Sequence, residues 1–105
     1  MGGERAMDIA VTSTEYVHAN ITATANGTPI TVASPPQVAF LPASNTNNPA
    51  TEDWLTGEWN GSQARILVGP NGGTVTLEPG AYKMWISFAA GLETPVKRVG
   101  QVTVY

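Results

Sequence analysis

The chain has 105 residues, the length of one domain, and 42% of them are hydrophobic while only 12% are charged. The net charge is −3 with five Lys and Arg in all, so the sequence offers no basic surface for nucleic acid or for an anionic membrane. The absence of cysteine excludes a disulfide framework, a thiolate metal site and a cysteine nucleophile. A weakly charged surface favours association, which is typical of a protein that works in an assembly.

Residues 1–7 contain no apolar run and are predicted to form a flexible leader, followed by a single domain over residues 8–105. No window of the domain has a helical period. Short runs alternate between apolar and polar residues and are separated by Gly, Pro and Asn, which favours an all-β fold. The predicted strands cover 8–12, 15–25, 28–33, 37–41, 54–59, 63–68, 74–77, 81–89 and 96–105.

Turn residues separate these strands in chain order. Asn26–Gly27 favours a type I′ turn, so residues 15–25 and 28–33 are expected to form a hairpin. Residues 42–53 are the longest polar stretch and are expected to be an exposed loop, either ordered for binding or disordered. Strands at roughly ten-residue spacing favour an antiparallel sandwich or barrel. The motif described next narrows this to an immunoglobulin-like antiparallel β-sandwich of about seven to eight strands.

The strongest strand, residues 81–89, follows a Pro–Gly turn within Leu77–Tyr82 (LEPGAY). An aromatic residue after such a turn is typical of the tyrosine corner, in which the Tyr hydroxyl bonds an upstream backbone group at the start of strand F. The inward partner across the core is expected to be Trp59 or Trp54 on strand C. The predicted core residues are Trp59, Tyr82, Met84, Ile86 and Phe88.

The pattern from residue 59 to residue 105 resembles a family of short immunoglobulin-like proteins from the structural gene cluster of actinobacterial tailed phages and prophages. The resemblance rests on Trp59, on the run Ala64–Pro70 (ARILVGP), on Leu77-x-Pro79–Gly80-x-Tyr82-x-x-Trp85 and on Pro95–Gly100 (PVKRVG). The first half of the chain matches more loosely, through Glu15–Val17 and Ala25–Pro29.

The resemblance implies an accessory virion protein, made in the bacterial host cytoplasm. Such a protein would decorate the capsid by docking on the major capsid protein, and it could also form a homo-oligomer. The motifs concern the fold, so a place at the head–tail neck or on the tail stays open. The family brings no catalytic residues and no cofactor, and no nucleic-acid or membrane partner is expected.

The residues themselves also argue against an enzyme. His18 is the single histidine, and it is predicted on the outer face of a strand rather than beside a nucleophile. Glu52, Asp53 and Glu58 are the closest acidic residues, but a small sandwich offers little cleft for a catalytic pair. Their spacing fits no calcium loop, so we expect no metal site.

Three features are candidate binding surfaces: the 42–53 loop, a set of aromatic residues on outer faces, and a terminal strand (1–13 or 96–105) at a sheet edge. For Trp85, packing under a neighbouring loop is the alternative to exposure. A module that binds surface carbohydrate or a receptor is the alternative function, and it would need at least two of the three tryptophans exposed together. The candidate interface residues are Tyr16, Asn45, Asn47, Asn48, Trp54 and Trp85.

Overall fold

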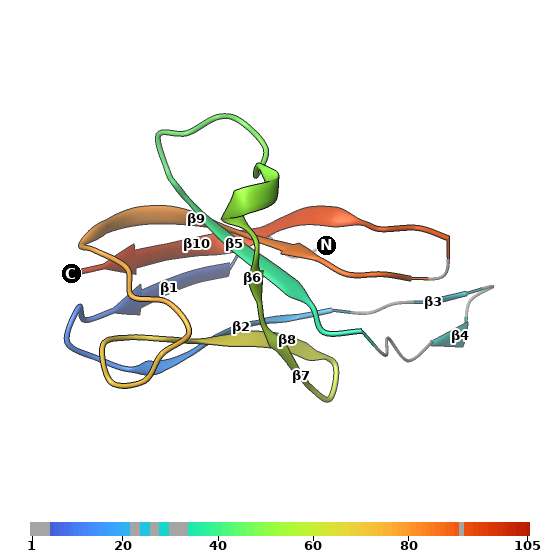
Figure 1. The fold of residues 1–105 in the computed structure, drawn as a ribbon, viewed down its shortest axis with the longest axis horizontal. Coiled ribbons are helices and arrows are strands. Elements are labelled where there is room, and N and C mark those ends of the chain that lie inside the picture. The colour runs from blue at the N-terminus through green and yellow to red at the C-terminus, as the bar shows by residue number, and fades with distance from the viewer. Residues whose placement is uncertain (1–4, 22–23, 26–27, 30–33, 91) are drawn as a thin grey trace.

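The computed structural model describes residues 5–21, 24–25, 28–29, 34–90 and 92–105. Two β-sheets pack face to face, with one 3₁₀ turn and no α-helix among these residues (Figure 1). The strands are β1 (Arg5–Ile9), β2 (Glu15–Asn20), β3 (Thr24–Ala25), β4 (Thr28–Pro29), β5 (Gln37–Pro42), β6 (Leu55–Thr56), β7 (Glu58–Asn60), β8 (Gln63–Val68), β9 (Gly80–Ser87) and β10 (Val96–Val104), and the 3₁₀ turn is η1 (Thr51–Asp53).

The order of the strands is that of an immunoglobulin-like sandwich, as the sequence predicts. The five-stranded sheet runs β1-β10-β9-β5-β6, in which β10, β9, β5 and β6 take the places of strands G, F, C and C′. The three-stranded sheet runs β2-β8-β7, in the places of B, E and D. The one parallel pair is β1 with β10, where Arg5 lies opposite Gly100 and Ile9 opposite Val104.

The core lies between the two sheets and is built from the inner-facing positions of each strand. Met84, Ile86 and Phe88 are buried, and Tyr82 packs against them while it stays partly exposed, so the predicted ridge is confirmed. Alternation of this kind is the expected result of a strand with one face on the core. The other buried members of the core are Ile9, Val17, Val38, Ala64, Ile66, Val68, Val102 and Val104.

The tyrosine corner is present at the start of β9. The Tyr82 hydroxyl donates a hydrogen bond to the Glu78 backbone oxygen at 2.7 Å, four residues upstream. Gly80 between them has φ +152°, a conformation that L side chains rarely adopt. The Pro–Gly turn therefore fixes both the start of β9 and the direction of the ring.

Trp59 belongs to the core, but the prediction that it lies on strand C is wrong. Strand C is β5, whereas Trp59 lies on β7 in the opposite sheet. Its ring meets Phe88 edge-on, with centroids 5.9 Å apart and an interplanar angle of 77°. Its indole Nε1 donates to the Ser34 backbone oxygen at 2.8 Å. The aromatic pair thus joins the two layers.

The predicted strand over residues 54–59 is in fact two short strands in different sheets. β6 pairs with β5 and β7 pairs with β8, so the chain crosses the sandwich at Gly57 (Figure 1). A Cβ built on Gly57 would lie 2.7 Å from the Arg65 backbone oxygen. The crossing needs a residue without a side chain because the backbones approach this closely.

The N-terminal boundary also differs from the prediction. β1 begins at Arg5, so residues 5–7 of the expected leader form strand structure, while residues 1–4 lie outside the described residues. Residues 5–7 pair with β10, so backbone groups that would bond water in a free leader are paired within the protein instead.

Two other boundaries change. Residues 74–77 form only an isolated parallel bridge, Val68 with Val75, rather than a strand. In the hairpin over 15–33, β3 pairs with β4, whereas β2 pairs with β8. Asn26–Gly27 and residues 30–33 lie outside the described part of the chain.

Candidate protein interface

The outer face of the five-stranded sheet carries two tryptophans. Ala39 of β5 lies opposite Trp85 of β9, and Trp85 lies opposite Arg98 of β10. Trp54 directly precedes β6, and the β5–β6 register places it beside Ala39 on this outer face. Neither tryptophan is among the side chains that pack on the core. We call Trp54, Ala39, Trp85 and Arg98 the tryptophan row.

The tryptophan row is partly covered. Trp54 and Trp85 are half-buried, and Ala39 between them has no exposed surface. The Nε1 atom of Trp85 is buried and has no hydrogen-bond partner among the described residues. Trp85 is thus only partly exposed, and the Nε1 atom of its indole lies on the buried side.

The 42–53 loop lies over this same outer face (Figure 1). The Ala43 amide donates to the Ala81 backbone oxygen at 2.8 Å, and the Lys83 ammonium donates to the Asn45 backbone oxygen at 3.0 Å. Within the loop, the Asn47 amide donates to the Asn45 side-chain oxygen at 2.8 Å. These bonds favour the ordered form of the loop over the disordered one.

The predicted loop residues differ in exposure. Asn45 is half-buried and holds the loop in place, whereas Asn47 and Asn48 are exposed. Asp53 at the end of η1 accepts a hydrogen bond from the Ala50 amide at 2.8 Å. The loop beside the tryptophan row is thus fixed to the sheet, and it exposes the amides of Asn47 and Asn48 as well as the carboxylate of Glu52.

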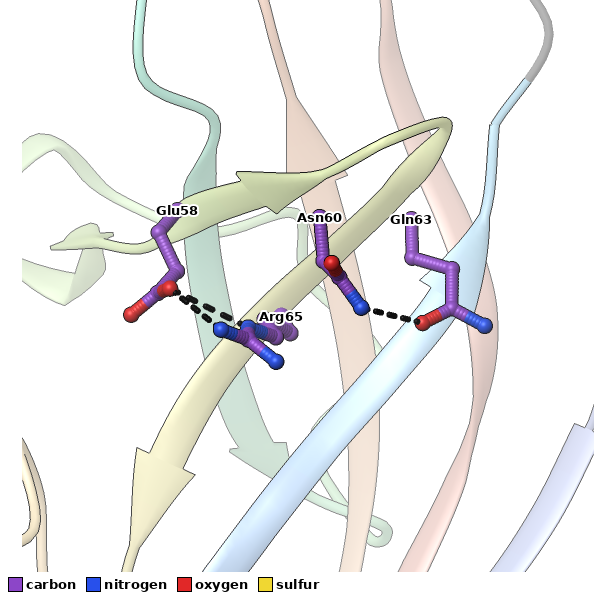
Figure 2. Close-up of polar contacts among 4 residues, drawn as sticks. All are labelled: Glu58, Asn60, Gln63 and Arg65. Atoms are coloured by element: carbon purple, nitrogen blue, oxygen red, sulfur yellow. Dashed lines mark hydrogen bonds and ion pairs between the residues drawn. The ribbon is translucent and has the colours of Figure 1, made fainter.

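Tyr16 lies on the outer face of the other sheet, so the structure does not bring it together with Trp54 and Trp85. The Arg65 guanidinium lies over its ring, 4.0 Å from the ring centroid. Arg65 also pairs with Glu58, with its Nη2 at 2.8 Å and its Nε at 3.1 Å from one carboxylate oxygen (Figure 2).

Beside this ion pair, Asn60 and Gln63 face each other across the β7–β8 hairpin (Figure 2). Their side chains are 3.5 Å apart at the closest polar atoms, which is a weak contact. The predicted strands 54–59 and 63–68 leave Asn60 between them, so this cluster was not expected from the sequence. Pairing Asn60 with Gln63 across a two-residue turn, Gly61–Ser62, would have put Glu58 opposite Arg65.

The residues considered for catalysis or metal binding have structural contacts or surface positions. Glu58 is engaged by Arg65 and Asp53 by the Ala50 amide, while Glu52 is exposed. His18 is half-buried on the outer face of β2, opposite Arg65. In the described part of the chain, no three His, Asp or Glu side chains gather as a metal site would require.

The β9–β10 loop carries an exposed apolar residue that is not among the predicted interface residues. Ala90 and Glu93 exchange backbone hydrogen bonds of 2.8 and 3.1 Å, which closes a tight turn. Leu92, in this turn, is fully exposed at 106% of its reference surface. A single exposed leucine is common on protein surfaces, so Leu92 serves best as a reference residue away from the tryptophan row.

Comparison with known proteins adds no relative: no family model, no curated protein and no solved structure matches the chain. None of the helical turns that the structure describes is long and apolar enough to cross a membrane.

Proposed function

We propose that this protein is an accessory structural protein of a phage virion, which docks on the major capsid protein as a decoration or minor capsid protein. The resemblance of residues 59–105 to short immunoglobulin-like virion proteins motivates the proposal. The low charge of the chain supports it, because weakly charged surfaces associate readily. The protein would be made in the host cytoplasm and then join the particle.

The observation on which the docking role depends is the tryptophan row. Trp and Arg are the residue types that most often dominate the energy of a protein interface, and here they share one sheet face. The uncharged Ala39 lies between Trp54 and Trp85, and a centre of aromatic residues without charge is typical of an interface core. Many copies on a symmetric shell would add avidity to each contact.

A place at the neck or on the tail would use the same surface, so it remains the nearest alternative location. The second alternative, a module that binds carbohydrate or a receptor, is less well supported. A carbohydrate platform needs two or more fully presented aromatic rings, whereas Trp54, Trp59 and Trp85 are all half-buried and Trp59 packs on the core.

The proposal is tested by sedimenting particles from the strain that carries this gene in a density gradient, followed by mass spectrometry of the fractions. We expect the protein in the particle fraction at a constant ratio to the major capsid protein. A protein that stays in the free soluble fraction would overturn the proposal.

The docking surface is tested with the same gradient and two single substitutions. Trp54→Ser removes an aromatic ring from the tryptophan row, and Leu92→Ser removes an exposed apolar side chain from the β9–β10 loop, outside that row. We expect Trp54→Ser to lower the bound amount at least about tenfold and Leu92→Ser to leave it unchanged. Equal binding by both variants would contradict a role for the tryptophan row.

A further inference from the structure

One edge of β2 has no strand partner among the residues that the structure describes, and we call it the free edge of β2. β2 lies at the end of the β2-β8-β7 sheet, and among the described residues its only strand partner is β8. The Ile21 amide donates to the Ser62 backbone oxygen at 2.8 Å, so the backbone groups of Ile21 point toward the β8 side of β2. Because every second residue of an antiparallel strand points its backbone groups at the same neighbour, those of Tyr16, His18 and Asn20 point away from β8.

The other sheet edges are short or protected by charge. β6 has two residues and β7 has three, too few for an extended pairing. β1 has five residues. The Tyr105 amide donates to the Ile9 oxygen, so the backbone groups of Ile9 point toward β10 and those of the preceding residue, Asp8, point outward. The carboxylate side chain of Asp8 is exposed. A charged side chain at an outward-pointing position of an edge strand is a common protection against pairing.

β2 lacks these protections. Its six residues, EYVHAN, include no proline and no lysine, and its pairing with β8 has no bulge. Its one acidic residue, Glu15, lies at the first position of the strand rather than at its centre.

We propose that β2 pairs with β2 of a second copy of this chain, antiparallel about a two-fold axis at His18. In this register His18 faces the partner's His18, and Tyr16 faces the partner's Asn20. All three outward residues are used, so roughly six backbone hydrogen bonds join the chains. The pairing would merge the two three-stranded sheets into one continuous sheet.

The side chains of β2 suit a second copy. Glu15 and the partner's Glu15 would lie at opposite ends of the pair, about 20 Å apart along the strand direction, so like charges do not meet. Arg65, opposite His18, has its charge paired with Glu58 and stacks on Tyr16, so the centre of the contact has no unpaired charge among these groups.

Two-fold pairing through β2 would give a closed dimer rather than a longer array. A dimer made in this way uses the free edge of both copies at once, and the remaining edges are the short or charged ones. Stable protein complexes bury about 1,200 Å² of surface or more, and a contact between two strand edges buries less. We therefore expect a dissociation constant in the micromolar to sub-millimolar range.

Sedimentation velocity of the purified chain tests this inference, and it needs neither virus nor host. The wild type should show a monomer–dimer equilibrium below about 1 mM protein. His18→Lys and His18→Glu would each place like charges at the axis, and each should raise the dissociation constant at least about tenfold. An equimolar mixture of the two should recover the dimer, since opposite charges then meet.

His18→Gln is the matched control, since it changes the side chain without adding charge and should dimerise like the wild type. Circular dichroism and the melting temperature verify that each variant is folded. A wild type that remains monomeric throughout, or charged variants that dimerise as well as His18→Gln does, would overturn the inference. Failure here would leave the proposed virion role standing, because that role is tested on particles.

Discussion

Trp59 and Trp85 show how two half-buried residues of the same type take opposite roles. The Trp59 indole satisfies its donor with the Ser34 backbone oxygen at 2.8 Å and packs edge-on against Phe88. The Trp85 indole has its Nε1 buried without an acceptor among the described residues, a position that costs stability. The buried, unpaired Nε1 makes Trp85 unfavourable for folding. This is consistent with a role for Trp85 in binding a partner.

Replacing each tryptophan by phenylalanine separates these roles. Trp59→Phe loses a hydrogen bond in addition to ring volume, whereas Trp85→Phe removes an unpaired buried donor. We expect the free energy of unfolding to fall about 1 kcal/mol more for Trp59→Phe than for Trp85→Phe. Urea denaturation of the two variants measures this difference, and equal losses would contradict the assignment.

At the scale of elements, the crossing at Gly57 determines what the neighbouring strands can do. It ends β6 after two residues and starts β7 in the other sheet, which separates Trp54 from Trp59. Trp54 lies on the outer face of the five-stranded sheet, while Trp59 packs on the core from the three-stranded sheet.

Because of this crossing, we expect the lack of space, rather than the backbone conformation, to exclude a side chain at position 57. In Gly57→Ala the new Cβ would meet the Arg65 backbone oxygen at 2.7 Å and Val38 Cγ2 at 3.1 Å, so we expect a loss of about 3 kcal/mol. Gly61→Ala is the control, because Gly61 has φ +62° and open space around it, and it should cost about 1 kcal/mol. The reverse order in thermal denaturation would contradict this account of the crossing.

The sequence predicts the elements whose pattern is local. Alternation places Met84 and Ile86 in the core, and the Pro–Gly turn before Tyr82 predicts the tyrosine corner, because both depend on a few consecutive residues. The sheet of Trp59 could not be predicted, because a continuous run of strand-forming residues does not reveal a sheet change at a single glycine.

In the candidate interface, too, only the features with a local sequence pattern could be predicted. Exposure of Tyr16 follows from alternation along β2, and the structure places it on an exposed face as expected. The contact of Lys83 with Asn45, which fixes the 42–53 loop on the sheet, joins residues 38 positions apart and has no local signal. Tertiary contacts, rather than composition, thus decide which aromatic residues share a surface.

At the scale of the whole molecule, the two proposed contacts use different layers. The tryptophan row lies on the outer face of the five-stranded sheet, whereas the free edge of β2 belongs to the three-stranded sheet (Figure 1). One copy can therefore dock through the tryptophan row and pair with a second copy through β2. Weak pairing of this kind gains strength where many docked copies stand side by side.

Docking on the particle is the central claim, and adding the purified protein back to particles tests it most directly. Particles are made by a strain in which the gene is deleted, and the bound protein is measured after sedimentation over a range of added concentrations. We predict saturable binding, with a final ratio to the major capsid protein equal to that of wild-type particles. Folded protein that does not bind these particles at any concentration would contradict the account.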